Sequence, residues 1–152
     1  MHELALTYNV GEKLYHFLNP NFEKVPNYSW EKEYNLNNEG RTDLVYLSKS
    51  KKRESIALEI KMDDTWMEYK RDFKKLSSAK LNTPTGSELI KYFCGLKLVL
   101  SEEQANQFIE QLKKNPKNYF SAILITQRIF ETINVEKKAL CSFTFWKIIN
   151  TK

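Results

Sequence analysis

Three residues in the first half of the chain, Asp43, Glu59 and Lys61, are of the types that bind a metal ion and stabilise charge during phosphoryl transfer. Asp43 lies in the segment TDLVYL and the other two lie in IALEIK, and both segments have the aliphatic, β-branched composition of strands. Carboxylate oxygens are the ligands that Mg²⁺ prefers, with waters completing its shell. A lysine beside them can stabilise an attacking hydroxide or a developing negative charge. These residues therefore form a candidate metal and catalytic site.

The two segments are predicted to be neighbouring strands of a hairpin, joined by the charged loop SKSKKRES at residues 48–55. Side chains alternate along a strand, so Glu59 and Lys61 point to one face while Ile60 points to the other. A hairpin that closes symmetrically sets Asp43 opposite Ile60. A one-residue shift, as a bulge gives, sets Asp43 directly against Glu59 or Lys61.

An ordinary structural role is the alternative for each of these charges. Asp43 would then begin a strand, and Glu59 with Lys61 would form an exposed ion pair at the edge of a sheet. An ion pair of Glu59 and Lys61 alone does not explain why Asp43 brings a third charge to the same place. Because the strand ends near Lys61, we expect its ammonium group to reach solvent.

The elements that position these residues follow from apolar periodicity and helix-capping patterns. A helix is predicted over residues 3–18, where Asn9 and Gly11 could break it near its middle. Capping boxes that begin at Thr65 and Ser101 predict two more helices, the first ending near Ser78 and the second near residue 115. Strands are predicted at residues 28–36, 41–47, 56–61, 90–100, 119–126 and 139–149. The predicted order is α-β-β-β-α-β-α-β-β, in a single domain spanning residues 1–152.

Composition narrows the class of protein. Lys and Arg number 24 against 19 Asp and Glu, a net charge of +5, which permits a polyanionic partner without demanding one. Cys94 and Cys141 lack disulfide or zinc-site spacing, and His2 and His16 have no partner at metal-ligand spacing, so reduced thiols and ordinary histidines are expected. No secretory signal and no apolar run long enough for a membrane span are found, which predicts a cytoplasmic protein with no membrane partner.

GRTDLVYL followed by SIALEIK resembles the D-(x)n-E-x-K signature of the PD-(D/E)xK nuclease superfamily, over roughly residues 1–80. The resemblance implies an α/β fold with a restriction-endonuclease-like core, a mixed β-sheet flanked by helices. It also implies that Asp43 and Glu59 are metal ligands and that Lys61 is the catalytic lysine. Thr42 stands where the name of the family has proline, and the helix after the motif has no obvious glutamine–tyrosine pair.

Many members of the superfamily have a further metal-binding glutamate on the first helix. The resemblance offers Glu3 or Glu12 for that place, and Glu3 is preferred because it starts the helix. Glu33, in the segment EKEYN, also resembles a residue on the first strand of several such nucleases, although a solvated charge is the alternative. The implied cofactor is Mg²⁺, or Mn²⁺ in its place.

The function that the resemblance implies is hydrolysis of phosphodiester bonds by a metal-dependent endonuclease, with DNA preferred to RNA as the expected substrate. A homodimer or a separate recognition partner would supply specificity, because 152 residues leave little room for a further domain. One alternative is a catalytically silent module of the same fold that binds nucleic acid or a protein partner. The other is an interaction protein whose many aromatic residues form a partner surface.

Two groups of basic residues are candidate phosphate contacts. One lies on the helix after the motif, on the face expected to point away from Trp66 and Phe73, and comprises Lys70, Arg71, Lys74 and Lys75. The other lies in the hairpin loop and comprises Lys49, Lys51, Lys52 and Arg53. Either group could contact nucleic acid, and a solvated charged surface is the alternative for both. Trp66 and Phe73 are expected in the core rather than as base-stacking platforms.

Overall fold

The elements of the computed structural model follow one another in the predicted order, α-β-β-β-α-β-α-β-β. The structure describes residues 3–20, 26–35, 40–80, 85–114, 120–132 and 139–150, with the side chains of residues 3, 4 and 132 left out. The helices in these ranges are α1 (Glu3–Leu18), α2 (Trp66–Ser78) and α3 (Glu102–Lys113). The strands are β1 (Tyr28–Asn35), β2 (Arg41–Ser48), β3 (Ser55–Met62), β4 (Leu89–Val99), β5 (Phe120–Thr132) and β6 (Ala139–Asn150).

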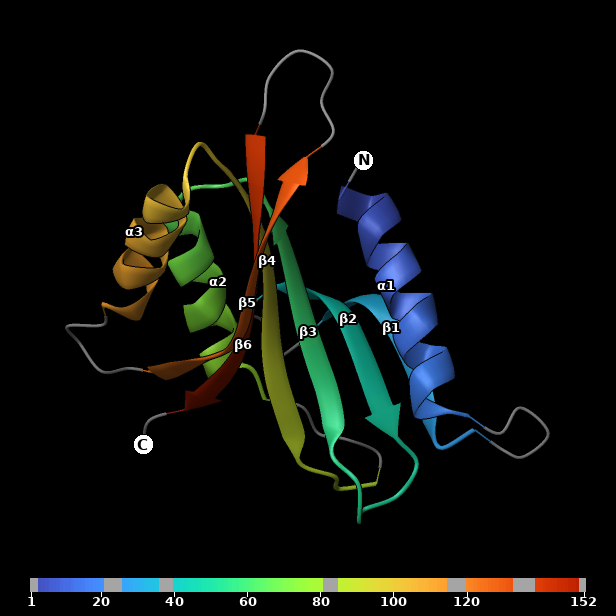
Figure 1. The fold of residues 1–152 in the computed structure, drawn as a ribbon. Helices are drawn as coiled ribbons and strands as arrows, with labels where there is room; N and C mark the ends of the chain where they lie inside the picture. The colour runs from blue at the N-terminus through green and yellow to red at the C-terminus, as the bar shows by residue number, and fades with distance from the viewer. Residues whose placement is uncertain are drawn as a thin grey trace.

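The strands form one mixed sheet in the order β1-β2-β3-β4-β6-β5, with α1 on one face and α2 and α3 on the other (Figure 1). Only β3 and β4 pair in parallel, and α2 makes the crossover that such a pair requires. The other neighbouring strands are antiparallel. The predicted α/β class, a mixed sheet flanked by helices, is confirmed at this level.

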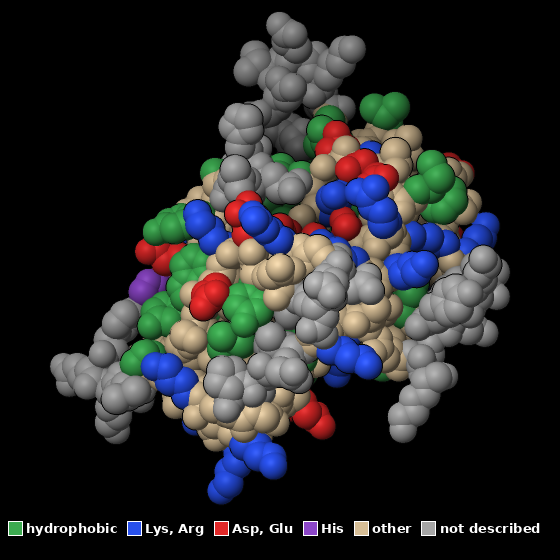
Figure 2. Space-filling view, turned by 180° about the vertical axis from the view of Figure 1, so that it is seen from behind, with side chains coloured by type: hydrophobic (Ala, Val, Ile, Leu, Met, Phe, Trp, Pro, Cys, Tyr) green, Lys and Arg blue, Asp and Glu red, His purple; other side chains and the backbone are tan. Residues whose placement is uncertain are grey.

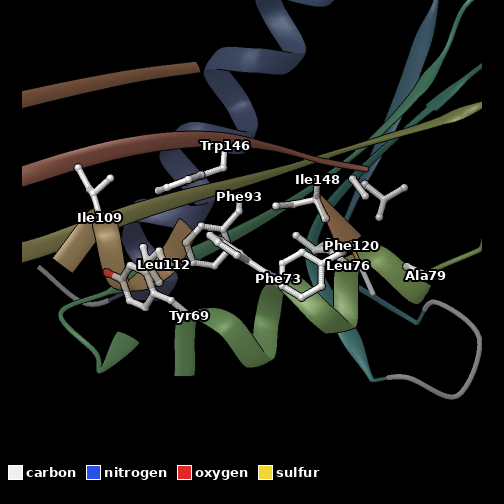
Figure 3. Close-up of a cluster of buried hydrophobic side chains, with 12 residues drawn as sticks. Tyr69, Phe73, Leu76, Ala79, Phe93, Ile109, Leu112, Phe120, Trp146 and Ile148 are labelled. Atoms are coloured by element: carbon white, nitrogen blue, oxygen red, sulfur yellow. The ribbon is translucent and has the colours of Figure 1, made fainter. Parts of the chain in front are cut away.

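One face of the sheet packs against α2 and α3 through a buried apolar cluster (Figure 3). Phe73 of α2 is fully buried, as predicted, and its ring centroid lies 4.8 Å from that of Phe93 on β4 and 5.4 Å from that of Trp146 on β6. Val45 on β2 and Ala57 on β3 belong to the same cluster. The side chains of Val45 and Ala57 therefore face α2. Because side chains alternate along a strand, those at every second position from these two residues face α2 as well.

The other face packs against α1, which is continuous, so the predicted break near its middle is wrong. A Cβ atom on Gly11 would lie 2.6 Å from the Trp30 ring and 2.9 Å from the Leu44 side chain. The Tyr46 hydroxyl donates a hydrogen bond of 2.9 Å to the Gly11 carbonyl. Glycine therefore allows the helix to approach the sheet closely instead of interrupting it.

Both predicted helix caps are present. The Thr65 hydroxyl accepts a hydrogen bond from the Glu68 N–H at the start of α2, and the Ser101 hydroxyl accepts one from the Gln104 N–H at the start of α3. These contacts satisfy N–H groups that have no partner within the helix. None of the described helices is long and apolar enough to cross a membrane.

Two expectations about the core and the strands are corrected. Trp66 is not in the core: it is the first residue of α2, one turn before the first buried residue Tyr69, and 39% of it is exposed. The strand predicted at residues 119–126 continues to Thr132, past a register shift between Leu124 and Thr126 against β6. An extra residue of this kind bends a strand without ending it.

His2 lies outside the described residues.

Candidate metal and catalytic site

The pairing of β2 with β3 ends where the candidate carboxylates begin. Leu44 pairs with Leu58, and the same register continued by one residue sets Asp43 opposite Glu59, which is one of the two arrangements predicted for a shifted hairpin. There, the Ile60 N–H donates a hydrogen bond of 2.6 Å to Asp43 Oδ2. A side-chain carboxylate thus takes the place that a strand carbonyl would have in a continued ladder.

Glu59 is buried, with 6% of its surface exposed, on the face of β3 that packs against α2. Its Oε1 lies 2.5 Å from Lys75 Nζ, whereas Oε2 is a buried oxygen with no hydrogen-bond partner among the described residues. Burial and, to a smaller extent, the charge of Asp43 raise the pKa of this carboxyl to about 7, against the opposing effect of Lys75. Glu59 is therefore a carboxylate that needs positive charge nearby in order to stay ionised.

Lys61 lies on the same face and points toward α2. Its Nζ is 3.2 Å from Asp72 Oδ2 and 3.7 Å from Asp64 Oδ2. Only 18% of the side chain is exposed, so most of the lysine is covered, and contact of its ammonium group with solvent stays a prediction. Helix α2 follows β3 and lies on this face of the sheet (Figure 1), and its Asp72 pairs with the lysine.

Sequence reasoning missed two residues of this site, both on α2. Asp72 is buried and pairs with Lys61. Lys75 Nζ contacts Glu59, donates a hydrogen bond of 2.9 Å to the Arg41 carbonyl and lies 3.9 Å from Asp72 Oδ1. The burial of Asp72 could have been predicted from the sequence, because it lies among the residues of α2 that pack in the core. A charged side chain at such a position needs a partner of opposite charge.

We call these five groups the charge cluster: Asp43, Glu59, Lys61, Asp72 and Lys75. The alternative in which Glu59 and Lys61 form an exposed pair at a sheet edge is wrong, because β3 lies between β2 and β4 and Glu59 is buried. The cluster brings three carboxylates and two ammonium groups together beneath α2. All three residues predicted to carry the chemistry belong to it.

The other acidic candidates do not join the cluster by any described contact. Glu33 lies in β1 opposite Asp43, because the residues before and after Glu33 pair with those after and before Asp43. Its side chain is about half exposed, and its carboxylate lies 3.5 Å from Arg41 Nη1. Its φ of +51° is in the left-handed region, which is uncommon for a residue with a side chain. Glu12 is exposed on α1, across the sheet from the cluster. Glu3 begins α1, and its side chain lies outside the described residues.

The basic residues of α2 do not share one outward face as predicted. Lys75 points into the charge cluster, so it does not share an outward face with the other three, and its role as a phosphate contact stays a prediction. Lys70 donates to the Lys114 carbonyl and lies over the Trp66 ring, 5.3 Å from its centroid. Arg71 is exposed and pairs with Glu68, and Lys74 is exposed.

On the face of the molecule seen in Figure 2, basic side chains are scattered among acidic and neutral ones instead of forming one continuous patch. The lysines and the arginine of the loop between β2 and β3 are exposed, as a solvated loop requires. The part of the described surface seen in Figure 2 therefore shows no single basic surface that by itself marks a path for nucleic acid.

The chemistry of the donors fits a hard divalent cation. The described residues contain no group of three or more His, Cys, Asp or Glu side chains arranged to hold a metal. Asp43 and Glu59 nevertheless offer two carboxylates, and the buried Glu59 Oε2 has no other use among the described contacts. Mg²⁺ is commonly bound by one or two carboxylates while waters fill its remaining positions. Two carboxylates are therefore a sufficient protein contribution for this ion.

Comparison of the chain with protein-family models, with curated proteins and with solved structures gives no match.

Proposed function

We propose that this chain is a metal-dependent nuclease with a restriction-endonuclease-like core, and that Asp43, Glu59 and Lys61 form its active site. The observation that carries the proposal is the Glu59 carboxylate, buried beside Asp43, whose Oε2 has no hydrogen-bond partner among the described residues. Burial of a carboxylate oxygen without a hydrogen-bond partner lowers stability, so a compensating interaction is expected. Ligation of Mg²⁺ or Mn²⁺ by Glu59 and Asp43 supplies one.

A bound divalent ion would polarise a phosphoryl oxygen and help to generate the hydroxide that attacks phosphorus. The residues of the chain have separate tasks around it. The Ile60 N–H holds the Asp43 carboxylate in place through Oδ2. Lys61 offers only hydrogen-bond donors, so it stabilises negative charge on the hydroxide or on the phosphate instead of binding the ion.

Asp72 has a positioning task in this mechanism. Its buried carboxylate lies 3.2 Å from Lys61 Nζ and orients the lysine on the side of β3 where Glu59 lies. A lysine held in this way loses little conformational entropy when a substrate binds. The expected substrate is nucleic acid, with DNA preferred, and a homodimer or a recognition partner would supply sequence specificity.

A catalytically silent module that binds nucleic acid or a protein partner is the second candidate. Lys75 already neutralises one oxygen of Glu59, so the charge cluster can hold α2 on the sheet without any metal. Strand β5 also exposes about half of each of three large apolar side chains, Ile123, Ile125 and Phe130. Exposed apolar surface of this kind is a feature of partner-binding proteins.

The experiment that separates the two candidates is incubation of the purified protein with single- and double-stranded DNA and RNA, in Mg²⁺, in Mn²⁺ or in a chelator. A nuclease cleaves at least one substrate when metal is present, and neither the chelator-treated protein nor Asp43→Asn does so. Cleavage by Asp43→Asn at the wild-type rate would point to a contaminating enzyme. Absence of cleavage of every substrate in both metals would favour the silent module.

A further inference from the structure

Lys75 occupies the position that a counter-charge for Glu59 requires. Its Nζ lies 2.5 Å from Glu59 Oε1 and 3.9 Å from Asp72 Oδ1. It also donates a hydrogen bond to the carbonyl of Arg41, at the start of β2 and two residues before Asp43. The ammonium group therefore lies at the place where β2 and β3 bring their carboxylates together.

A divalent ion on the same carboxylates would meet this ammonium group. Glu59 presents one oxygen to Lys75 and has one buried oxygen without a hydrogen-bond partner among the described residues. An ion bound through Glu59 and Asp43 would lie close to Lys75 Nζ, where two like charges in a poorly hydrated site repel strongly. Lys75 and the ion therefore compete for Glu59.

The two lysines of the charge cluster differ in how they are held. Lys61 lies between two carboxylates, those of Asp72 and Asp64, and does not need Glu59 for its charge balance. Lys75 has Glu59 as its nearest carboxylate, its distance to Asp72 is longer, and it lies in the last turn of α2 on a flexible stem. Lys75 is thus the lysine that can withdraw toward solvent when an ion arrives.

We propose that Lys75 is the resident cation of the Asp43–Glu59 pair, and that a divalent ion binds by displacing it from Glu59. Lys75 is in this sense a positioning residue, which maintains the carboxylates in the metal-free protein and limits the affinity for metal. This inference rests on the proposed function, because it concerns the same site.

The test is calorimetric titration of Mg²⁺ into four proteins at about pH 8, where the Glu59 carboxyl is mainly ionised. They are wild type, Lys75→Met, Asp43→Asn and the control Lys113→Met. Lys113 also ends a helix and also pairs with a glutamate, Glu110 at 3.1 Å, but this pair is exposed and no described contact joins it to the charge cluster. The control therefore loses the same charge and an ion pair without uncovering Glu59.

Lys75→Met is expected to bind Mg²⁺ on the order of tenfold more tightly than wild type, and Lys113→Met as wild type does. Without metal, the Tm of Lys75→Met should fall, and saturating Mg²⁺ should raise it by more than it raises that of wild type. If Lys75→Met does not fold, Lys75→Gln retains a donor for Glu59 without the charge and takes its place.

The outcomes separate this inference from the proposed function. Equal Mg²⁺ affinity of wild type and Lys75→Met, with none for Asp43→Asn, would leave the metal site standing and overturn the competition. Weaker binding by Lys75→Met would overturn it as well. Equal binding, or none, in all four proteins would overturn both the metal site and the role of Lys75.

Discussion

The carboxylate of Asp43 accepts a hydrogen bond of 2.6 Å from the backbone N–H of Ile60. This contact joins β2 to β3 through a side chain just where the regular ladder ends. It also explains how Asp43 and Glu59 are held near each other although their charges repel, as the raised pKa of Glu59 indicates. The first prediction follows from this hydrogen bond.

Asp43→Ala should be less stable than Asp43→Asn by about 1–2 kcal/mol. Both substitutions remove the repulsion toward Glu59, but only asparagine keeps an oxygen that can accept from the Ile60 N–H. Urea unfolding of the two variants measures the difference directly. Both should also lose Mg²⁺ binding in calorimetry. Equal stability of the two variants would show that the hydrogen bond contributes nothing to the fold.

Glu59→Gln should change the pH dependence of stability. The pKa of Glu59 is raised in the folded protein to about 7 from an ordinary 4.5, so folding favours the protonated acid. The contribution of Glu59 to the stability of wild type should therefore fall as pH rises from about 4.5 to about 7, by at most about 3 kcal/mol in total. Below that window no loss is present, and above it the loss is constant.

Unfolding free energies measured at intervals from about pH 4 to about pH 9 check this prediction. The difference between Glu59→Gln and wild type should grow in favour of the variant across the window and then level off. The slope is the diagnostic quantity, because glutamine changes the contact with Lys75 at every pH. A difference that does not vary with pH would mean that Glu59 ionises normally in the folded protein.

Any affinity for nucleic acid should depend on salt and on the exposed basic residues of α2. Arg71→Glu combined with Lys74→Glu should weaken binding and reduce the slope of log affinity against log salt by about 2, or about one for each phosphate no longer neutralised. Lys75 is left out of this pair because it points into the charge cluster. Lys13→Glu, on the exposed side of α1 across the sheet, is the control. An unchanged slope would exclude this part of α2 from the nucleic-acid interface.

Gly11→Ala should destabilise the protein despite the better helix propensity of alanine. The added methyl group would overlap the Trp30 ring, and the resulting displacement should lower stability by about 1–3 kcal/mol. Asn9→Ala, at an exposed position of the same helix, isolates the propensity and should be neutral or stabilising. Thermal unfolding of both variants decides, and a Gly11→Ala protein as stable as Asn9→Ala would contradict the close packing.

Local patterns are sufficient to predict the order of the elements. Thr65 and Ser101 cap their helices through contacts within three residues, and such contacts are encoded in the sequence next to them. The role of Gly11 cannot be predicted in this way, because it depends on Trp30, which reaches it from another element. Glycine weakens an isolated helix, and only the tertiary structure shows why it is retained.

The candidate site is predictable on the strands but not on the helix. Alternation along β3 is a strict rule, so Glu59 and Lys61 can be assigned to one face from sequence. Lys75 lies two positions from the buried Phe73, a spacing that predicts an outward side chain. A long lysine side chain can still bend back to a carboxylate near it in space. The spacing along the helix predicts the direction in which the side chain leaves the backbone, but not where its ammonium group lies.

If Lys61 acts in the chemical step of a metal-dependent nuclease, the single-turnover rate of Lys61→Ala must fall. Its pairing with the buried Asp72 means that alanine also lowers stability, so the rate is measured well below the Tm and metal affinity is measured in parallel. Lys61→Arg keeps a charge for Asp72 but places it differently, and it should restore stability better than rate.

Lys61→Ala should cleave on the order of 10²–10³ times more slowly than wild type, while it binds Mg²⁺ with similar affinity. Cleavage by folded Lys61→Ala at the wild-type rate would contradict this prediction.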